Sequence, residues 1–262
     1  MTFSLDAIQR GCAERPPRVT VYGPPGVGKS TWAAGAPKPI FIQTEDGADQ
    51  IGVDRFPLCR TFDDAMECLR ALGREGHDYQ TVVLDSADWL ERLAEAKVAA
   101  DYNATSIDDT GVKAFGYGKG RELAASLVSM FVKSLDWLRD NKDMAVIIIG
   151  HSEVKRFDNP LGNAYDRYQP RLYKASLATV IEWSDALLFA GYETFTRTDD
   201  TGRKDRVVGV GDGRRILYTD ERPGHLAKNR YSLAPKLDLT YAAFDKARRE
   251  YMAARRQEGV ES

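Results

Sequence analysis

The sequence of 262 residues contains few cysteines and few histidines. The cysteines are Cys12, Cys59 and Cys68, and the histidines are His77, His151 and His225. An odd number of cysteines without a CxxC pair fits reduced thiols of a cytosolic protein better than a disulfide framework. The histidines are too scattered for a zinc motif. The sequence therefore predicts neither a disulfide scaffold nor a structural metal.

The sequence also lacks a long apolar run and an excess of either charge. Its longest strongly apolar run, at 145–149, is far too short to cross a bilayer, and its first residues show no signal-peptide hydrophobic region. The formal net charge of -2 excludes a globally basic nucleic-acid binder, so such contacts would need local patches. With 43% hydrophobic and 29% charged residues, we expect a globular, soluble, cytoplasmic protein without a membrane partner.

Short, almost wholly apolar segments rich in β-branched residues alternate with helical patterns. The predicted strands are 18–23, 39–44, 80–85, 145–150 and 185–191, and the predicted helices are 62–73, 87–100, 119–140 and 172–183. This alternation indicates a sheet buried on both faces. We therefore predict an α/β fold with a mainly parallel central sheet flanked by helices, whose functional edge lies at the carboxyl ends of the strands.

The sequence changes in character after the last predicted strand. Short strand candidates flank DDTG at 199–202 and GDG at 211–213, which predicts hairpins. Residues 240–257 are a predicted closing helix, with Asp238 or Thr240 as its N-cap. No repeat or linker divides the chain into halves. The expected parts are an N-terminal extension (1–16), one core (17–238) and a C-terminal basic helix and tail (239–262).

The segment GPPGVGKS, at 23–30, matches the phosphate-loop pattern G-x-x-x-x-G-K-[ST] in full, directly after a predicted strand and before a helix. Backbone N–H groups of such a loop surround a phosphate, Lys29 neutralises the β- and γ-oxygens, and the Ser30 hydroxyl reaches Mg²⁺. The predicted nucleotide-binding residues are Gly23, Pro24, Pro25, Gly26, Val27, Gly28, Lys29, Ser30 and Thr31. ATP and Mg²⁺ are the expected cofactors.

Two carboxylates follow predicted strands. Asp85 ends the strand TVVLD and is expected to hold the magnesium shell with Ser30, although many buried strands end in Asp because a loop begins there. Glu45 follows another strand and could polarise a water for attack on a γ-phosphate, or be a solvated loop acid.

The order of the motifs resembles the core of RecA-like ATPases. The segments that carry this resemblance are GPPGVGKST, IQTEDGAD, VVLDSADWL, VIIIGH and AKNR, across roughly residues 17–235. Within that superfamily the chain looks like the small phage-encoded ATPases associated with single-strand annealing and recombination. The resemblance implies a RecA-like P-loop NTPase core, with Glu45 activating water and Asp85 in the magnesium shell. His151 stands where these proteins usually carry a polar residue, often glutamine, that senses the γ-phosphate; a histidine departs from that pattern.

Lys228 and Arg230 stand two residues apart in GHLAKNRYSL, and in an extended segment their side chains would point to the same side. They resemble the basic pair with which RecA-like assemblies reach across a subunit boundary to the neighbour's nucleotide. Two cations suit a transition state whose charge spreads over the γ-phosphoryl oxygens. The alternative is a solvated basic turn.

Two segments combine cations with aromatic rings, as expected of a groove for single-stranded nucleic acid. The segment 152–174 is too long to be an ordinary connection between a strand and a helix, which predicts a functional or mobile segment. Residues 108–121 contain four glycines, which indicates mobility. The candidate contacts are Lys155, Arg156, Arg167, Tyr168 and Arg171 in the first segment and Lys113 and Lys119 in the second. A plain surface loop anchored by tyrosines is the open alternative for the first segment.

Together with these residues, the resemblance implies a DNA-stimulated ATPase that acts on single-stranded DNA in phage recombination or annealing, as a homo-oligomeric ring or filament in the host cytoplasm. A single-strand-binding protein is a candidate partner. One alternative is a small-molecule nucleotide kinase, although no arginine-rich lid is recognisable. Another is an annealing module in which ATP only switches the conformation.

Overall fold

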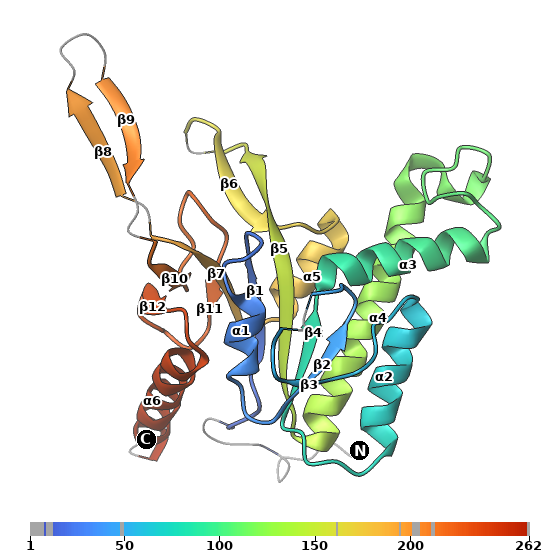
Figure 1. The fold of residues 1–262 in the computed structure, drawn as a ribbon, viewed down its shortest axis with the longest axis horizontal. Coiled ribbons are helices and arrows are strands. Elements are labelled where there is room, and N and C mark those ends of the chain that lie inside the picture. The colour runs from blue at the N-terminus through green and yellow to red at the C-terminus, as the bar shows by residue number, and fades with distance from the viewer. Residues whose placement is uncertain are drawn as a thin grey trace.

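The computed structural model describes residue 8 and residues 13–47, 50–160, 162–193, 195–200, 205–210 and 213–260, which form a central sheet flanked by helices (Figure 1). The strands are β1 (Arg18–Gly23), β2 (Pro39–Gln43), β3 (Asp54–Arg55), β4 (Thr81–Asp85), β5 (Ala145–Phe157), β6 (Tyr165–Pro170), β7 (Ala186–Tyr192), β8 (Phe195–Asp200), β9 (Asp205–Val210), β10 (Arg215–Tyr218), β11 (Lys228–Asn229) and β12 (Lys236–Asp238). The helices are α1 (Lys29–Ala34), α2 (Phe62–Arg74), α3 (Ala87–Asp101), the 3₁₀ helix η2 (Lys113–Gly118), α4 (Lys119–Lys142), α5 (Lys174–Trp183) and α6 (Tyr241–Val260).

The main path of the sheet runs in the order β12-β10-β7-β1-β5-β4-β2-β3. From β7 to β3 all neighbouring strands are parallel, whereas β10, β11 and β12 add antiparallel pairs on one side. The predicted fold class is therefore confirmed, as are the hairpin around DDTG and the closing helix of the C-terminal part. Gly23 at the end of β1 lies beside His151 on β5, and Asp85 at the end of β4 lies beside Ile149. The predicted phosphate site lies at this end of the parallel strands.

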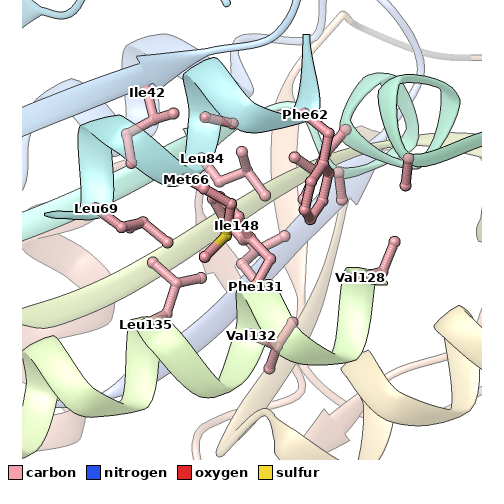
Figure 2. Packing of buried hydrophobic residues seen from close by; sticks show 14 of the residues in the cluster. Ile42, Phe62, Met66, Leu69, Leu84, Val128, Phe131, Val132, Leu135 and Ile148 are labelled. Atoms are coloured by element: carbon pink, nitrogen blue, oxygen red, sulfur yellow. The ribbon is translucent and has the colours of Figure 1, made fainter. Parts of the chain in front are cut away.

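Side chains of the central strands alternate between two cores. On β5, Val146 and Ile148 belong to the core beneath α2, α3, α4 and α5, and Ile147 belongs to the core beneath α1 and α6. Figure 2 shows the first core, in which the rings of Phe62 and Phe131 lie 6.3 Å apart in an edge-on arrangement. Because both faces of the sheet are covered, the strand ends that carry the site are held in fixed positions.

The closing helix α6 packs on α1 through aromatic rings. Tyr241 and Phe244 lie 5.2 and 5.6 Å from Trp32, measured between ring centroids. Thr240 caps the helix, since its Oγ1 accepts a hydrogen bond from the backbone N–H of Ala243 at 3.2 Å. The division of the chain into extension, core and tail stays a prediction.

The segment 152–174 is not an ordinary connecting loop, because much of it forms strands, and its functional or mobile character stays a prediction. β5 continues to Phe157 and pairs with β6 in antiparallel register from Ser152↔Pro170 to Phe157↔Tyr165. The extension was missed because its residues are polar, whereas the predicted strand was recognised by its apolar run. We call the β5–β6 hairpin beyond the sheet the arm.

Other parts of the prediction differ in detail. β8 pairs with β9, as predicted around DDTG, but β10 beyond GDG pairs with β7 instead of β9, so the prediction of a hairpin around GDG was wrong. Residues 201–202 and 211–212 of these two turns, and Cys12, lie outside the described residues. In the segment 108–121, η2 carries Phe115 into the core, and the mobility of this segment stays a prediction.

Among the helices of the described ranges, none combines the length and apolar character that a membrane span requires.

Candidate nucleotide site

The phosphate loop joins β1 to α1 and requires glycine at several places. Gly26 and Gly28 have φ angles of +74° and +105°, a region that side chains with a Cβ rarely adopt. At Gly23 a Cβ would lie only 2.1 Å from the carbonyl oxygen of Ala190, so β1 and β7 could not approach as they do. The glycines therefore shape a loop that caps the central strand of the sheet.

The side chain of Lys29 points back into this loop. Its Nζ donates hydrogen bonds to the carbonyl oxygens of Gly23 at 3.1 Å and Pro24 at 3.0 Å. Burial lowers the pKa of Lys29, while the nearby charge of Asp85 acts in the opposite direction. The ammonium group is thus held at the place where the loop would enclose a phosphate.

Ser30, in the first turn of α1, meets Asp85 at the carboxyl end of β4. The Ser30 hydroxyl donates a hydrogen bond of 2.7 Å to Oδ2 of Asp85. Burial raises the pKa of Asp85, against the opposing effect of this hydrogen bond. A hydroxyl and a carboxylate are hard oxygen ligands, so the donor set fits Mg²⁺.

Glu45 lies beside the Ser30–Asp85 pair and contacts Ser86 and His151. Oε2 of Glu45 accepts a hydrogen bond of 3.1 Å from the Ser86 hydroxyl, and it lies 3.7 Å from Nδ1 of His151. Both Glu45 and His151 line the same cavity as the phosphate loop, with a volume of about 490 Å³. A water inside this cavity would be within reach of the Glu45 carboxylate.

The structure brings most of the predicted nucleotide site together around this cavity. The predicted residues that line it are Pro25, Gly26, Gly28, Lys29, Ser30, Thr31, Glu45, Asp85 and His151. Gly23, Pro24 and Val27 do not line it. The Val27 side chain is fully buried in the core, which leaves only its backbone available to a phosphate.

Asp88 is a residue of the site that the sequence analysis missed. This nearly buried carboxylate lies 3.1 Å from Nδ1 of His151 and accepts a hydrogen bond from the His151 backbone N–H. It also accepts a short hydrogen bond from Arg171. Burial alone would raise the pKa of Asp88, but the hydrogen bonds from His151 and Arg171 outweigh it and hold the pKa well below its usual range. Its place three residues after Asp85, in the first turn of a helix, was the available signal.

Arg215 is a second residue that the sequence analysis missed. It begins β10 and lines the nucleotide cavity. Its Nη1 lies 3.2 Å from the position that a Cβ of Gly28 would occupy. No motif marks it, because it comes from the antiparallel side of the sheet, far from the loop in sequence.

Lys228 and Arg230 lie at the amino ends of the parallel strands, away from the phosphate loop. β11 is antiparallel to β7 and pairs with its first residues, near where β1 also begins. Nζ of Lys228 donates to the carbonyl oxygens of Ile181 at 2.7 Å and Glu182 at 3.0 Å, at the end of α5. Nη1 of Arg230 lies 3.3 Å from Asp185. The pair is therefore distant from the phosphate loop of its own chain, and its action on a neighbour stays a prediction.

The predicted nucleic-acid residues do not form one surface. The strand register places Lys155 opposite Arg167 on one face of the arm, and Arg156 with Tyr168 on the other face. Arg167 is bound to Glu221 at 3.0 Å and lies over the ring of Phe157.

Three further candidates are placed elsewhere. Arg171 pairs with Asp88 at the base of the arm. Lys113 belongs to η2 and Lys119 begins α4, and both are exposed. Contact of any of these residues with DNA stays a prediction.

A phosphate loop with its lysine, and a pair of magnesium-type oxygens, meet at one end of a parallel sheet, which places the chain in the class of P-loop ATPases. Residues 15–231 match the family described as AAA domain, and the chain belongs to this family. AAA ATPase domains bind and hydrolyse ATP and typically use Mg²⁺.

One curated relative extends the comparison. The chain is 23% identical over 255 residues to the SPbeta prophage-derived uncharacterized protein YorG of Bacillus subtilis (strain 168). The match covers 93% of this chain and 68% of that protein.

Proposed function

We propose that this protein hydrolyses ATP in an oligomer, with the nucleotide at a subunit boundary, and acts on single-stranded DNA in phage recombination or single-strand annealing. The observation that supports it best is the convergence of Lys29, Glu45 and the Ser30–Asp85 pair on one cavity. The AAA family match supports ATP hydrolysis, and the prophage origin of YorG supports a role in phage biology.

Each group of the cavity has a separate task in this proposal. Lys29 exchanges its loop carbonyls for the β- and γ-phosphate oxygens, and Ser30 and Asp85 hold Mg²⁺. The bound Mg²⁺ would supply positive charge against the phosphate oxygens. Glu45 orients a water for in-line attack on the γ-phosphorus. His151, in contact with both Glu45 and Asp88, senses the γ-phosphate.

The DNA is proposed to pass over the arm and the exposed lysines near α4. Asp88 connects the two parts of this proposal, because it contacts His151 in the cavity and Arg171 at the base of the arm. Occupation of the nucleotide site can therefore alter the contacts of Arg171, which would meet a DNA phosphate. Lys228 and Arg230 are proposed to act on the nucleotide of the neighbouring subunit.

The test is ATP hydrolysis measured with and without single-stranded DNA, alongside the particle size. Lys29→Ala should abolish nucleotide binding. Glu45→Gln should retain ATP but lower turnover roughly 10²- to 10⁴-fold, as expected for loss of a general base. Asp46→Asn is the matched control, since its side chain does not line the cavity.

Three results would contradict the proposal. One is undiminished ATP affinity in the Lys29→Ala variant. Another is ADP production that depends on nucleoside monophosphates and ignores DNA, which would indicate a small-molecule kinase. The third is normal DNA annealing by the Glu45→Gln variant, which would indicate that ATP serves only as a conformational switch.

A further inference from the structure

A second polar cavity lies at the edge of the sheet opposite the phosphate loop. Its volume is about 280 Å³. It is lined by five arginines, Arg15, Arg139, Arg230, Arg248 and Arg255, and by one carboxylate, that of Asp185. Asp185 immediately precedes β7, whose first residue pairs with Val19 near the start of β1. We call this cavity the arginine pocket.

The one carboxylate of the arginine pocket is shared among several guanidinium groups. Asp185 lies 3.0 Å from Nη2 of Arg18, 3.3 Å from Nη1 of Arg230 and 3.8 Å from Nη2 of Arg139. Arg18 also lies 3.6 Å from Asp136, and Arg139 lies 3.9 Å from Asp140, which pairs with Arg15 as well. Four arginines around the pocket thus share three carboxylates, which leaves a surplus of positive charge that an additional anion would neutralise.

Two of the cations are also withdrawn from water. Arg139 and Arg248 are each only 8% exposed. Burial lowers the pKa of Arg139, and the neighbouring charge of Arg18 lowers it further. Asp245, the partner of Arg248 at 3.0 Å, is itself shared with Arg249 at 2.7 Å. Desolvated cations that repel one another gain more from a bound anion than solvated surface cations do.

We propose that the arginine pocket binds a phosphate monoester group, carried by a free mononucleotide or by the 5′ end of a DNA strand. Guanidinium forks match phosphate oxygens in pairs, and a doubly charged phosphate balances clustered arginines better than a carboxylate does. The cavity also has room beyond one phosphate group. Tyr231 and Tyr251, whose rings meet edge-on with centroids 6.2 Å apart, provide a wall for a sugar or base.

The experiment uses the full chain with Lys29→Ala, which removes nucleotide binding at the phosphate loop. Inorganic phosphate, AMP and two oligonucleotides, one with a 5′-phosphate and one with a 5′-hydroxyl, are titrated into it by calorimetry. We expect saturable binding of phosphate and AMP at one site per chain. Tighter binding of the 5′-phosphorylated strand than of its hydroxyl counterpart identifies a DNA end as the source. Equal binding of the two strands, with AMP retained, identifies a free nucleotide.

Variants then locate the site. Arg248→Gln, and separately the more exposed Arg255→Gln, should weaken phosphate binding about tenfold or more, because each removes a charge-assisted contact. Lys246→Gln removes the same charge from the same helix, outside the pocket lining and paired with Glu250 instead of Asp245, and should have little effect. Absence of phosphate and AMP binding in the Lys29→Ala protein, or equal loss in all three variants, would overturn the proposal. ATP hydrolysis by the chain with Lys29 intact is measured separately, so the proposed ATPase function is judged independently.

Discussion

At the residue scale, Arg215 adds a cation to the nucleotide cavity that the phosphate-loop motif does not contain. Its guanidinium lies above Gly28, within reach of the phosphates that the loop would bind. We expect Arg215→Ala to weaken ATP binding about tenfold, the usual effect of losing a charge-assisted contact to phosphate. Titration with a fluorescent ATP analogue measures the affinity of the wild type and of the variant. Arg214→Ala is the matched control, because Arg214 pairs with Asp238 at 2.7 Å and does not line the cavity.

Equal loss of affinity in the Arg214 and Arg215 variants would show that positive charge near the cavity matters, and not the position of one guanidinium. Unchanged affinity in Arg215→Ala would show that the side chain does not contact the nucleotide.

Asp88 yields a prediction on stability and pH. Its carboxylate is nearly buried and joins His151 to Arg171, so Asp88→Asn should lower the free energy of unfolding by roughly 1–3 kcal/mol at neutral pH. Because the folded pKa of Asp88 lies below the usual aspartate value, this stabilisation is fully present above that value and is lost as the pH falls.

Denaturant unfolding of the wild-type protein and of the Asp88→Asn variant, measured at several pH values, tests this direction of the pH dependence. The difference between wild type and Asp88→Asn should shrink as the pH falls below about pH 4. A difference that grows below about pH 4 would contradict the assigned charge state.

At the scale of elements, the arm separates residues that look equivalent in the sequence. Arg156 shares its face with Val154 and Tyr168, which are 59% and 42% exposed and offer an apolar and aromatic surface for bases. Asp166 lies opposite Arg156 on this face, and Asp158 lies 3.8 Å from its Nε. Lys155 lies on the opposite face beside Arg167, which Glu221 already neutralises.

We therefore expect Arg156→Ala to weaken binding of single-stranded DNA severalfold and to reduce the slope of affinity against salt by about one phosphate contact. Lys155→Ala is the control from the opposite face and should have the smaller effect. Fluorescence anisotropy at several salt concentrations measures both. A larger effect of Lys155→Ala would place the DNA on the other face.

These elements also show what the sequence could and could not predict. The strands of the parallel sheet were predictable, because burial on both faces leaves an apolar run such as the one at 145–149. The phosphate loop and Asp85 were predictable because local motifs carry them. The polar part of β5 was not, since an exposed hairpin needs no apolar pattern. Asp88 and Arg215 were not, because their roles depend on contacts between segments distant in sequence.

At the scale of the whole molecule, the two proposed halves of an ATPase centre lie at opposite edges of the sheet. The phosphate loop follows the end of β1, whereas Arg230 contacts Asp185 beside its beginning. Within one chain, Arg230 is therefore separated from the nucleotide by the length of the strand β1. If Arg230 takes part in hydrolysis, it must act on the nucleotide of another subunit.

This geometry leads to a mixing experiment. Arg230→Ala should bind ATP nearly normally and turn it over about 10³- to 10⁵-fold more slowly, the range expected for an arginine supplied in trans. A Lys29→Ala subunit has an empty site but an intact Arg230, whereas an Arg230→Ala subunit has the reverse. In a mixed assembly the first subunit supplies the arginine that the second lacks, so hydrolysis should reappear at mixed boundaries.

The control is a mixture in which both subunits carry Arg230→Ala and only one also carries Lys29→Ala, which must stay inactive because no boundary contains the arginine. Co-assembly is verified by pull-down of a tagged subunit before activity is measured. Lys29→Ala and Arg230→Ala proteins that demonstrably co-assemble and yet remain inactive would show that Arg230 serves its own chain. Its contact with Asp185 would then be a structural ion pair that holds β11 beside the start of β7.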